Sequence, residues 1–202
     1  MNKRSKTYRS TLRLTVTALF MALTVIASMS VFSIPVPGGH LYVCDVVIVT
    51  AAILLDPPAA FCVGGIGSFL GDLLFYPAPM FVSLIAHGLQ AVIISLFTHY
   101  AFIRLDADAD SVKRTLAARR ERQALWSVVG VVIGGVIMVA GYTLGRAFIY
   151  GPALYGNAAV SYSITKLPYE LLQAAIGGIA GPLLCWKAGL VKLFRRLDFY
   201  TG

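Results

Sequence analysis

The side chains with the greatest capacity for chemistry in this 202-residue chain are few and isolated. Three carboxylates, Asp45, Asp72 and Glu170, stand in stretches that are otherwise rich in Leu, Ile, Val and Gly. An ionisable group inside a membrane span is costly and usually faces the interior of a helix bundle, so by default it indicates a functional site. Such groups can form hydrogen bonds and ion pairs, or exchange protons.

Other polar residues near them occur in pairs three or four positions apart, which places both members of a pair on one face of a helix. The pairs are His87 with Gln90, Glu170 with Gln173, and Tyr142 with Arg146. Aromatic surfaces for a flat ligand are available at Tyr42, Tyr142 and Trp126. The candidate substrate-binding residues are therefore Tyr42, Asp45, Asp72, His87, Gln90, Tyr142, Arg146, Glu170 and Gln173.

Structural explanations exist for some of these residues. Asp45 and Glu170 can be helix N-caps or first-turn acids that interact favourably with the helix dipole, and His87 can be a hydrogen-bonded structural histidine. The sequence contains no metal-ligand spacing, nucleophile elbow, phosphate-binding glycine loop or paired catalytic carboxylates. Cys44, Cys62 and Cys185 are far apart and are interpreted as small apolar helix residues. We therefore predict no catalytic residue, cofactor or metal.

Composition indicates the environment of these residues. The chain is 58% hydrophobic and 13% charged, whereas a soluble domain carries about 25% charged residues. Almost all of its Lys and Arg lie in three stretches, which the positive-inside rule assigns to the cytoplasmic face. These are the N-terminus to Arg13, residues 104–124 and the tail from Lys187. Because the basic residues flank apolar segments, the net charge of +8 favours anionic lipid over nucleic acid.

The predicted fold is an all-α integral membrane protein, one domain over 1–202, with six transmembrane helices and both termini cytoplasmic. Spans of about 20 apolar residues, and Pro and Gly clusters that mark turns, give helices at about 12–33, 43–55, 58–76, 80–103, 125–149 and 167–187. The first is predicted to be retained rather than a signal peptide because it is longer than an h-region. The short helix 43–55 is expected to be packed inside the bundle. The alternative treats 34–79 as a re-entrant region with two crossings fewer.

The connections on this topology differ in character. Residues 104–124 are predicted to be a solvated cytoplasmic connector, and 150–166 an outside loop that serves as a lid or a passive linker. Asp56 precedes Pro57-Pro58 at a cytoplasmic turn. The remaining carboxylates lie near the outer ends of their helices, so the polar residues are expected to line a pocket open to the outside.

The chain resembles the substrate-binding S components of energy-coupling factor (ECF) vitamin transporters, in the riboflavin-type or hydroxymethylpyrimidine/pyridoxine-type group. The matching blocks are 34–40 (IPVPGGH), a short spacer to Asp45, 64–74 (GGIGSFLGDLL), 87–90 (HGLQ), Gly141-Tyr142 and 167–173 (LPYELLQ). Three positions depart from the family pattern: Cys44 replaces a Gly, Glu170 an Asn, and Arg146 an acid. An ion pair between Arg146 and Glu170, or an anionic ligand group on Arg146, are both compatible with these changes.

The resemblance implies a six-helix bundle in a prokaryotic plasma membrane that captures a water-soluble vitamin or precursor, pyrimidine- or pyridine-like, from outside. It further implies docking to a membrane T component with two cytoplasmic ATPases through Ala18 and Ala22, so ATP hydrolysis would occur in the partners. Two alternatives remain from the residues alone. One is a membrane enzyme that uses Asp72, His87 and Glu170 as acid-base groups, and the other is a ligand-free assembly subunit.

Overall fold

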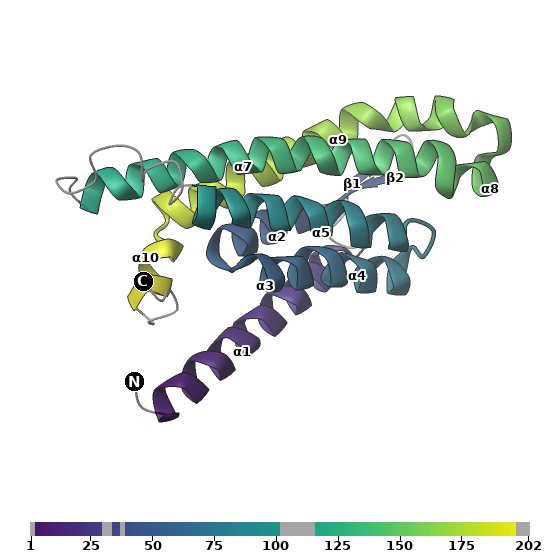
Figure 1. Cartoon of the computed structure of the whole chain (residues 1–202). Coiled ribbons are helices and arrows are strands. Elements are labelled where there is room, and N and C mark those ends of the chain that lie inside the picture. The colour runs from purple at the N-terminus through teal and green to yellow at the C-terminus, as the bar shows by residue number, and fades with distance from the viewer. Residues whose placement is uncertain (1–2, 30–33, 37–38, 102–115, 197–202) are drawn as a thin grey trace.

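The computed structural model describes residues 3–29, 34–36, 39–101 and 116–196 as a bundle of helices with one small hairpin (Figure 1). The elements in chain order are α1 (Lys3–Ala27), β1 (Ile34–Val36), β2 (Gly39–Leu41), α2 (Cys44–Leu54), α3 (Pro57–Phe61), α4 (Gly67–Phe75), α5 (Met80–Leu96), α7 (Leu116–Leu144), α8 (Gly151–Tyr155), α9 (Ala159–Pro182) and α10 (Leu190–Arg196). Wider π-helical turns continue α3 into α4 (Cys62–Ile66) and extend α5 (Phe97–Ala101), α7 (Gly145–Ile149) and α9 (Leu183–Lys187).

Four of the described helical segments are long and apolar enough to cross a membrane: Ser10–Ala27, Pro57–Phe75, Met80–Tyr100 and Arg120–Ile149. α2 is shorter, and its 11 residues span only about 16 Å. Its side chains form the centre of the core, with Ile48, Ile53 and Leu54 at most 1% exposed. The prediction that this short helix is packed inside the bundle is confirmed.

The first predicted helix and the turn after it need correction. α1 ends at Ala27, not at 33, and residues 30–33 lie outside the described part of the chain. The segment around Pro35 forms a strand, because Ile34 pairs with Leu41 and Val36 with Gly39 in an antiparallel hairpin. The description all-α is therefore wrong in this detail. β-branched residues around a proline disfavour a helix and suit a short edge strand.

The two predicted connections are also more helical than expected. α7 begins at Leu116, inside the predicted connector 104–124. Polar helix formers (Arg, Glu and Gln) among alanines continue this helix well beyond its apolar part. Residues 102–115 lie outside the described part. In the predicted loop 150–166, α8 and a 3₁₀ turn at Gly156–Ala158 lead directly into α9. α9 therefore starts at Ala159 rather than 167, and Pro168 lies within it.

Small residues bring the helix backbones close together. A Cβ added at Gly177 of α9 would lie 2.6 Å from the Cβ of Asp45 in α2, and one at Gly181 would lie 2.5 Å from Val49 Cγ1. An added Cβ at Gly64 would lie 2.6 Å from the carbonyl oxygen of His87. Such contacts exclude any side chain, so these glycines set the positions of α2, α5 and α9 relative to one another.

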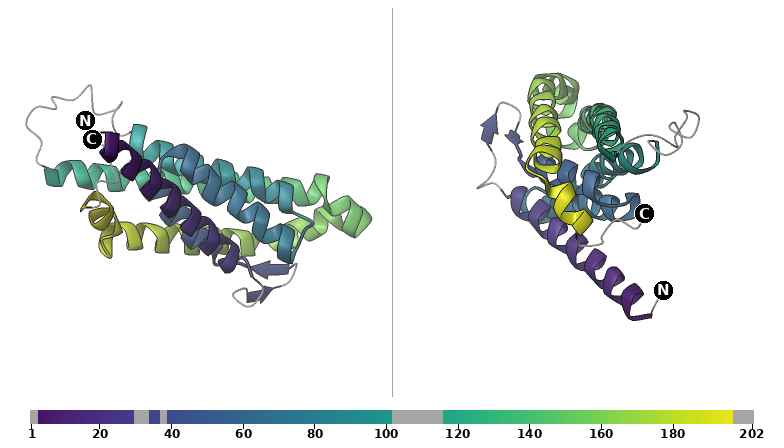
Figure 2. Two further views of the ribbon diagram at one scale, coloured as in Figure 1. Left: turned by 90° about the horizontal axis from the view of Figure 1, so that it is seen from below. Right: turned by 90° about the vertical axis from the view of Figure 1, so that its left-hand side faces the viewer.

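The two ends of the bundle differ (Figures 1 and 2). The N-terminal end of α1, the start of α7 and α10 lie toward one end of the molecule. The hairpin, α8 and the turn between α4 and α5 lie toward the other end. α1 crosses the bundle obliquely, and its N-terminal half extends away from the other helices.

The contact between α2 and α9 yields a stability prediction. Gly177→Ala is expected to lower the free energy of unfolding by about 1–3 kcal/mol, because the new methyl group overlaps the backbone and Cβ of Asp45. Gly135→Ala is the control, since its methyl group would meet only Ala174 Cβ at 3.8 Å. Thermal unfolding in detergent measures both. Equal midpoints for the two variants would contradict the role assigned to Gly177.

Candidate binding pocket

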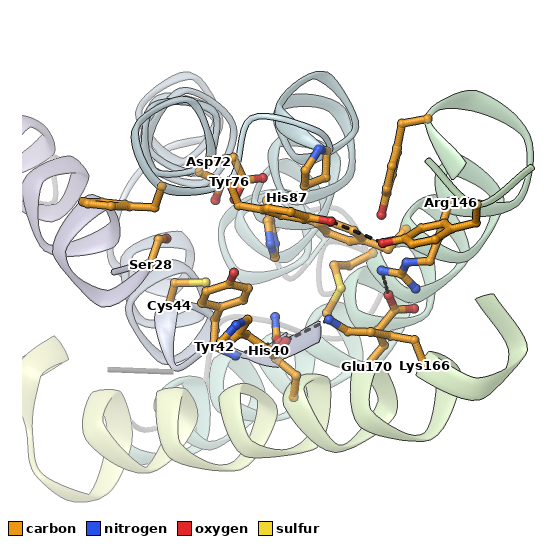
Figure 3. Close-up of a pocket in the computed structure, with 18 residues that line it drawn as sticks. Ser28, His40, Tyr42, Cys44, Asp72, Tyr76, His87, Arg146, Lys166 and Glu170 are labelled. Atoms are coloured by element: carbon orange, nitrogen blue, oxygen red, sulfur yellow. Dashed lines mark hydrogen bonds and ion pairs between the residues drawn. The ribbon is translucent and has the colours of Figure 1, made fainter. Parts of the chain in front are cut away.

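A cavity of about 280 Å³ lies between the helices near the hairpin end of the bundle (Figure 3). Seven of the nine predicted site residues line it: Tyr42, Asp72, His87, Tyr142, Arg146, Glu170 and Gln173. Asp45 and Gln90 do not line its wall, and instead hold residues that do.

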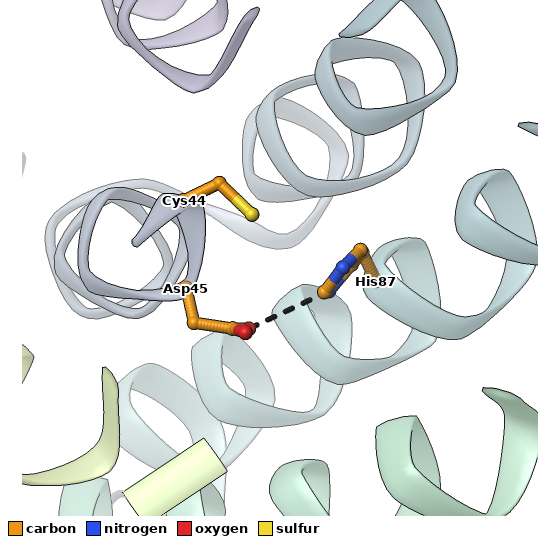
Figure 4. A group of neighbouring side chains, drawn as sticks. All are labelled: Cys44, Asp45 and His87. Carbon is orange, nitrogen blue, oxygen red and sulfur yellow. Dashed lines mark ion pairs between the residues drawn. The ribbon is translucent and has the colours of Figure 1, made fainter. Parts of the chain in front are cut away.

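Asp45 lies in the first turn of α2 and is only 1% exposed. Gln90 Nε2 of α5 donates to its Oδ1 at 3.2 Å, and Gln173 Nε2 of α9 donates to its Oδ2 at 2.5 Å. His87 Nδ1 of α5 lies 3.5 Å from the same Oδ1 (Figure 4). A buried carboxylate is tolerated only when such donors compensate its lost hydration. Asp45 therefore joins three helices and does not line the cavity.

His87 takes part in both this network and the cavity wall. Its Nδ1 lies 2.8 Å from Gln90 Oε1. Because the Gln90 amide nitrogen is directed at Asp45, its oxygen must accept, so His87 Nδ1 is the donor. The Tyr142 ring contacts the imidazole edge-on, with a centroid separation of 5.2 Å. The structural interpretation of His87 thus accounts for Nδ1 and leaves Nε2 outside this network.

Gln173 forms hydrogen bonds within the protein through both its amide nitrogen and its amide oxygen. Besides its bond to Asp45, its Oε1 accepts the backbone N–H of Tyr42 at 3.0 Å. This bond fixes the segment between the hairpin and α2 against α9. Burial, together with the negative charge of Asp72, raises the pKa of the Tyr42 phenol to about 12, so Tyr42 is neutral and able to donate a hydrogen bond at physiological pH.

Asp72 of α4 lies on the cavity wall. The Ser83 hydroxyl of α5 donates to its Oδ2, and the hydroxyl of Tyr142 in α7 contacts the same Ser83 oxygen. Since Ser83 donates to the carboxylate, Tyr142 is the donor to Ser83. Three helices thus hold Asp72 in place.

Arg146 and Glu170 form an ion pair at 2.6 Å, with each side chain 6% exposed. Thr143 Oγ1 also donates to Glu170, at 3.1 Å. Of the two possibilities left open by the sequence, the pairing is thus present. Lys166, one turn before Glu170, also lines the cavity and donates to the His40 carbonyl oxygen at 2.9 Å.

Lys166 and part of the aromatic wall were not predicted from the sequence. Lys166 and Arg146 are the two basic residues outside the three basic stretches. Their isolation in the sequence could have identified Lys166 as a candidate site residue. Tyr76 and Tyr155, whose hydroxyl oxygens are 3.3 Å apart, also line the cavity. Trp126 does not line the cavity, and its ring contacts Phe97 at a centroid separation of 6.2 Å.

Cys44, Asp45 and His87 have possible metal-ligand atoms within 4.8 Å of one another (Figure 4). However, both carboxylate oxygens of Asp45 already accept amide hydrogen bonds and His87 Nδ1 is bound to Gln90. The hydrogen-bond network accounts for this cluster without invoking a metal ion.

The network around Asp45 predicts a strong stability effect. Asp45→Ala is expected to lower the free energy of unfolding by on the order of 3 kcal/mol, because the amides of Gln90 and Gln173 lose a buried acceptor. Asp56→Ala is the matched control. Asp56 pairs with Arg13 where both side chains are partly exposed, and such pairs contribute about 1 kcal/mol or less. Thermal unfolding in detergent measures both variants. Equal losses of stability in the two would contradict the central role of Asp45.

Comparison with known proteins assigns the chain to a family. Residues 8–190 match the model of the ECF-type riboflavin transporter S component. An uncharacterised protein from Pyrococcus woesei is 29% identical over 164 residues, which cover 79% of this chain and 89% of that protein. A solved structure of the S component of a bacterial ECF transporter aligns with a TM-score of 0.56 and 16% identity, over 94% of this chain and 96% of the solved chain.

The solved structure shows the same fold at low sequence identity, and the family model extends over both the helices and the pocket residues. The resemblance inferred from the sequence is thereby confirmed, and this chain belongs to the S component family of ECF-type riboflavin transporters.

Proposed function

We propose that this membrane-embedded, substrate-binding subunit captures a small water-soluble vitamin or precursor, with a pyrimidine- or pyridine-like ring, from outside a prokaryotic plasma membrane. The observation that carries the proposal is the cavity of about 280 Å³. Ligand pockets occupy roughly 300–1,000 Å³ and combine apolar and aromatic walls with a few placed polar groups. A cavity just below this range favours a single-ring or compact two-ring ligand.

The cavity walls fit a flat polar ring. Tyr42, Tyr76 and Tyr142 supply aromatic surface, while Asp72 and His87 supply hydrogen-bonding groups. Asp72 is an acceptor when ionised, and the His87 nitrogen not bound to Gln90 is an acceptor when the imidazole is neutral. Ring N–H, amino or hydroxyl groups of a heteroaromatic vitamin are suitable donors to both.

Six crossings with both termini inside remain the proposed topology. The described parts of the three basic stretches lie toward one end of the bundle and the cavity toward the other (Figure 1), which supports a cavity open to the outside. The four long apolar segments provide four of the six crossings, and α2 and α9 provide the other two. α2 is short but shielded by its neighbours, and the charged side chains Lys166 and Glu170 of α9 are buried inside the bundle.

We further propose that α1 docks onto a membrane T component that is energised by two cytoplasmic ATPases. Ala18 and Ala22 are exposed on α1 and lie between exposed leucines, with Leu14 72% and Leu19 58% exposed. The glycines Gly67 and Gly71 of α4, in contrast, are packed against α1 at Thr24 and Ser28. A small-residue face left uncovered on an oblique helix suits close approach of a partner helix.

S components are binding subunits and not enzymes, which sets aside the alternative of an acid-base enzyme. The ligand-free assembly alternative is disfavoured by the cost of retaining charged groups around a cavity. Native mass spectrometry of the gently purified protein tests the proposal. A small-molecule adduct, with or without T and ATPase subunits, supports it, and a bare chain in repeated preparations speaks against it.

Asp72→Asn is expected to weaken binding of the co-purified vitamin about tenfold to a hundredfold. The change removes a charged acceptor from the wall while it keeps the size of the side chain. Isothermal titration calorimetry gives the affinity, and thermal unfolding checks that the bundle is intact. Asp56→Asn, at a site away from the cavity wall, is the control. Unchanged affinity in a folded Asp72→Asn protein would remove Asp72 from the site.

Ala18→Trp or Ala22→Trp is expected to leave vitamin affinity unchanged and to reduce cellular uptake at least tenfold, because an indole blocks close approach of a partner helix. Val132→Trp is the control, since Val132 is 61% exposed on α7. Uptake of radiolabelled vitamin and co-purification of the T component are measured side by side. Normal uptake with either α1 variant would refute the docking surface.

A further inference from the structure

We infer that the ligand of this pocket carries an anionic group, a carboxylate or a phosphate, which binds between Arg146 and Lys166. The inference rests on the proposed ligand-binding function and specifies the chemical class of the ligand. Charge is distributed unevenly over the cavity wall.

The positive side of the cavity is formed by Arg146, Lys166 and Glu170, which we call the basic pole (Figure 3). All three are buried, with exposures of 5%, 9% and 5%. Glu170 is ion-paired with Arg146 Nη2 through Oε1 and accepts the Thr143 hydroxyl through Oε2. Two cations therefore share one carboxylate, and the basic pole retains one positive charge.

Hydrogen-bond donors at the basic pole are also in excess. Within the described residues, Arg146 Nη1 is buried and has no hydrogen-bond partner. Lys166 Nζ donates to the His40 carbonyl oxygen, and no described carboxylate lies within ion-pair distance of it. An ammonium group has three donors, so this side chain retains capacity for a ligand. A buried donor without an acceptor is costly, and an oxyanion would satisfy both side chains.

The opposite side of the cavity carries a carboxylate instead of basic groups. Figure 3 places Asp72 across the cavity from Arg146 and Glu170, with His87 and Tyr76 between them. Asp72 is held by the Ser83 hydroxyl. A ligand with an acidic group at one end and an N–H or O–H donor at the other matches both sides, and its ring would lie against the tyrosines between them.

Three probes test the charge preference: benzoate, phenyl phosphate and the neutral analogue benzamide. Each is titrated calorimetrically into the full-length protein in detergent. We expect benzoate or phenyl phosphate to bind at least tenfold more tightly than benzamide. Tighter benzoate identifies a carboxylate ligand and tighter phenyl phosphate identifies a phosphate ligand. Equal affinities, stronger binding of benzamide, or no binding of either anion would overturn the inference.

Substitutions test whether the basic pole causes the preference for anionic over neutral probes. Lys166→Gln is expected to abolish the preference while it keeps a donor for the His40 carbonyl oxygen, and Lys166→Arg should retain it. Glu170→Gln should tighten anion binding several-fold, because it removes the carboxylate that competes for Arg146, and a merely structural role for Glu170 would not produce this gain. Lys192→Gln, an equal charge change on exposed α10, is the control and should change nothing. A preference that survives Lys166→Gln would overturn the assignment.

Identification of the co-purified ligand separates failure of this inference from failure of the proposed function. A neutral vitamin bound in the pocket would overturn the anionic class and leave vitamin capture intact. An acidic ligand whose affinity falls at least tenfold in Lys166→Gln would support both.

Discussion

The structure depends on one buried carboxylate. Asp45 is held at the start of the most deeply buried helix, where its charge has almost no access to solvent. Lost hydration must be replaced by hydrogen bonds, and the donors come from Gln90 on α5 and Gln173 on α9. The same two amides orient His87 and the backbone of Tyr42. The cost of burying this charge is therefore compensated by an arrangement that also positions the pocket wall.

Glycine makes that arrangement sterically possible. Gly177 allows α9 to approach Asp45 itself, and Gly64 allows the neighbouring segment to approach the backbone at His87. In a membrane, helix association depends on close packing and interhelical hydrogen bonds because lipid is as apolar as the helix surface. Exposed small residues on α1 and buried ones elsewhere thus have different roles. The buried residues fix the pocket, and the exposed face forms the proposed docking surface for the T component.

Much of the fold could be predicted because its signals are local. Apolar length, proline clusters and the grouping of basic residues located the helices, and blocks such as HGLQ at 87–90 indicated the family. Predictions of helix starts at 125 and 167 were wrong because charged or proline-containing segments can continue a helix outside the apolar core. The predicted end at 33 was wrong for a different reason, since α1 already ends at Ala27 and a strand follows at Ile34–Val36. The strand pairing of Ile34 with Leu41 depends on contacts across a turn, and helix patterns do not reveal such pairing.

By itself, the sequence determined the membrane environment, the helical class and a set of polar residues too costly to be buried without a purpose, because these follow from composition and spacing. Only the tertiary structure separated Asp45 and Gln90, which support the site, from Asp72, His87 and Arg146, which line it. It also brought Lys166 beside the cavity and placed Trp126 away from it. The physical reason is that solvation and hydrogen-bond partners depend on neighbours from other helices, so the role of a buried polar group is decided by packing.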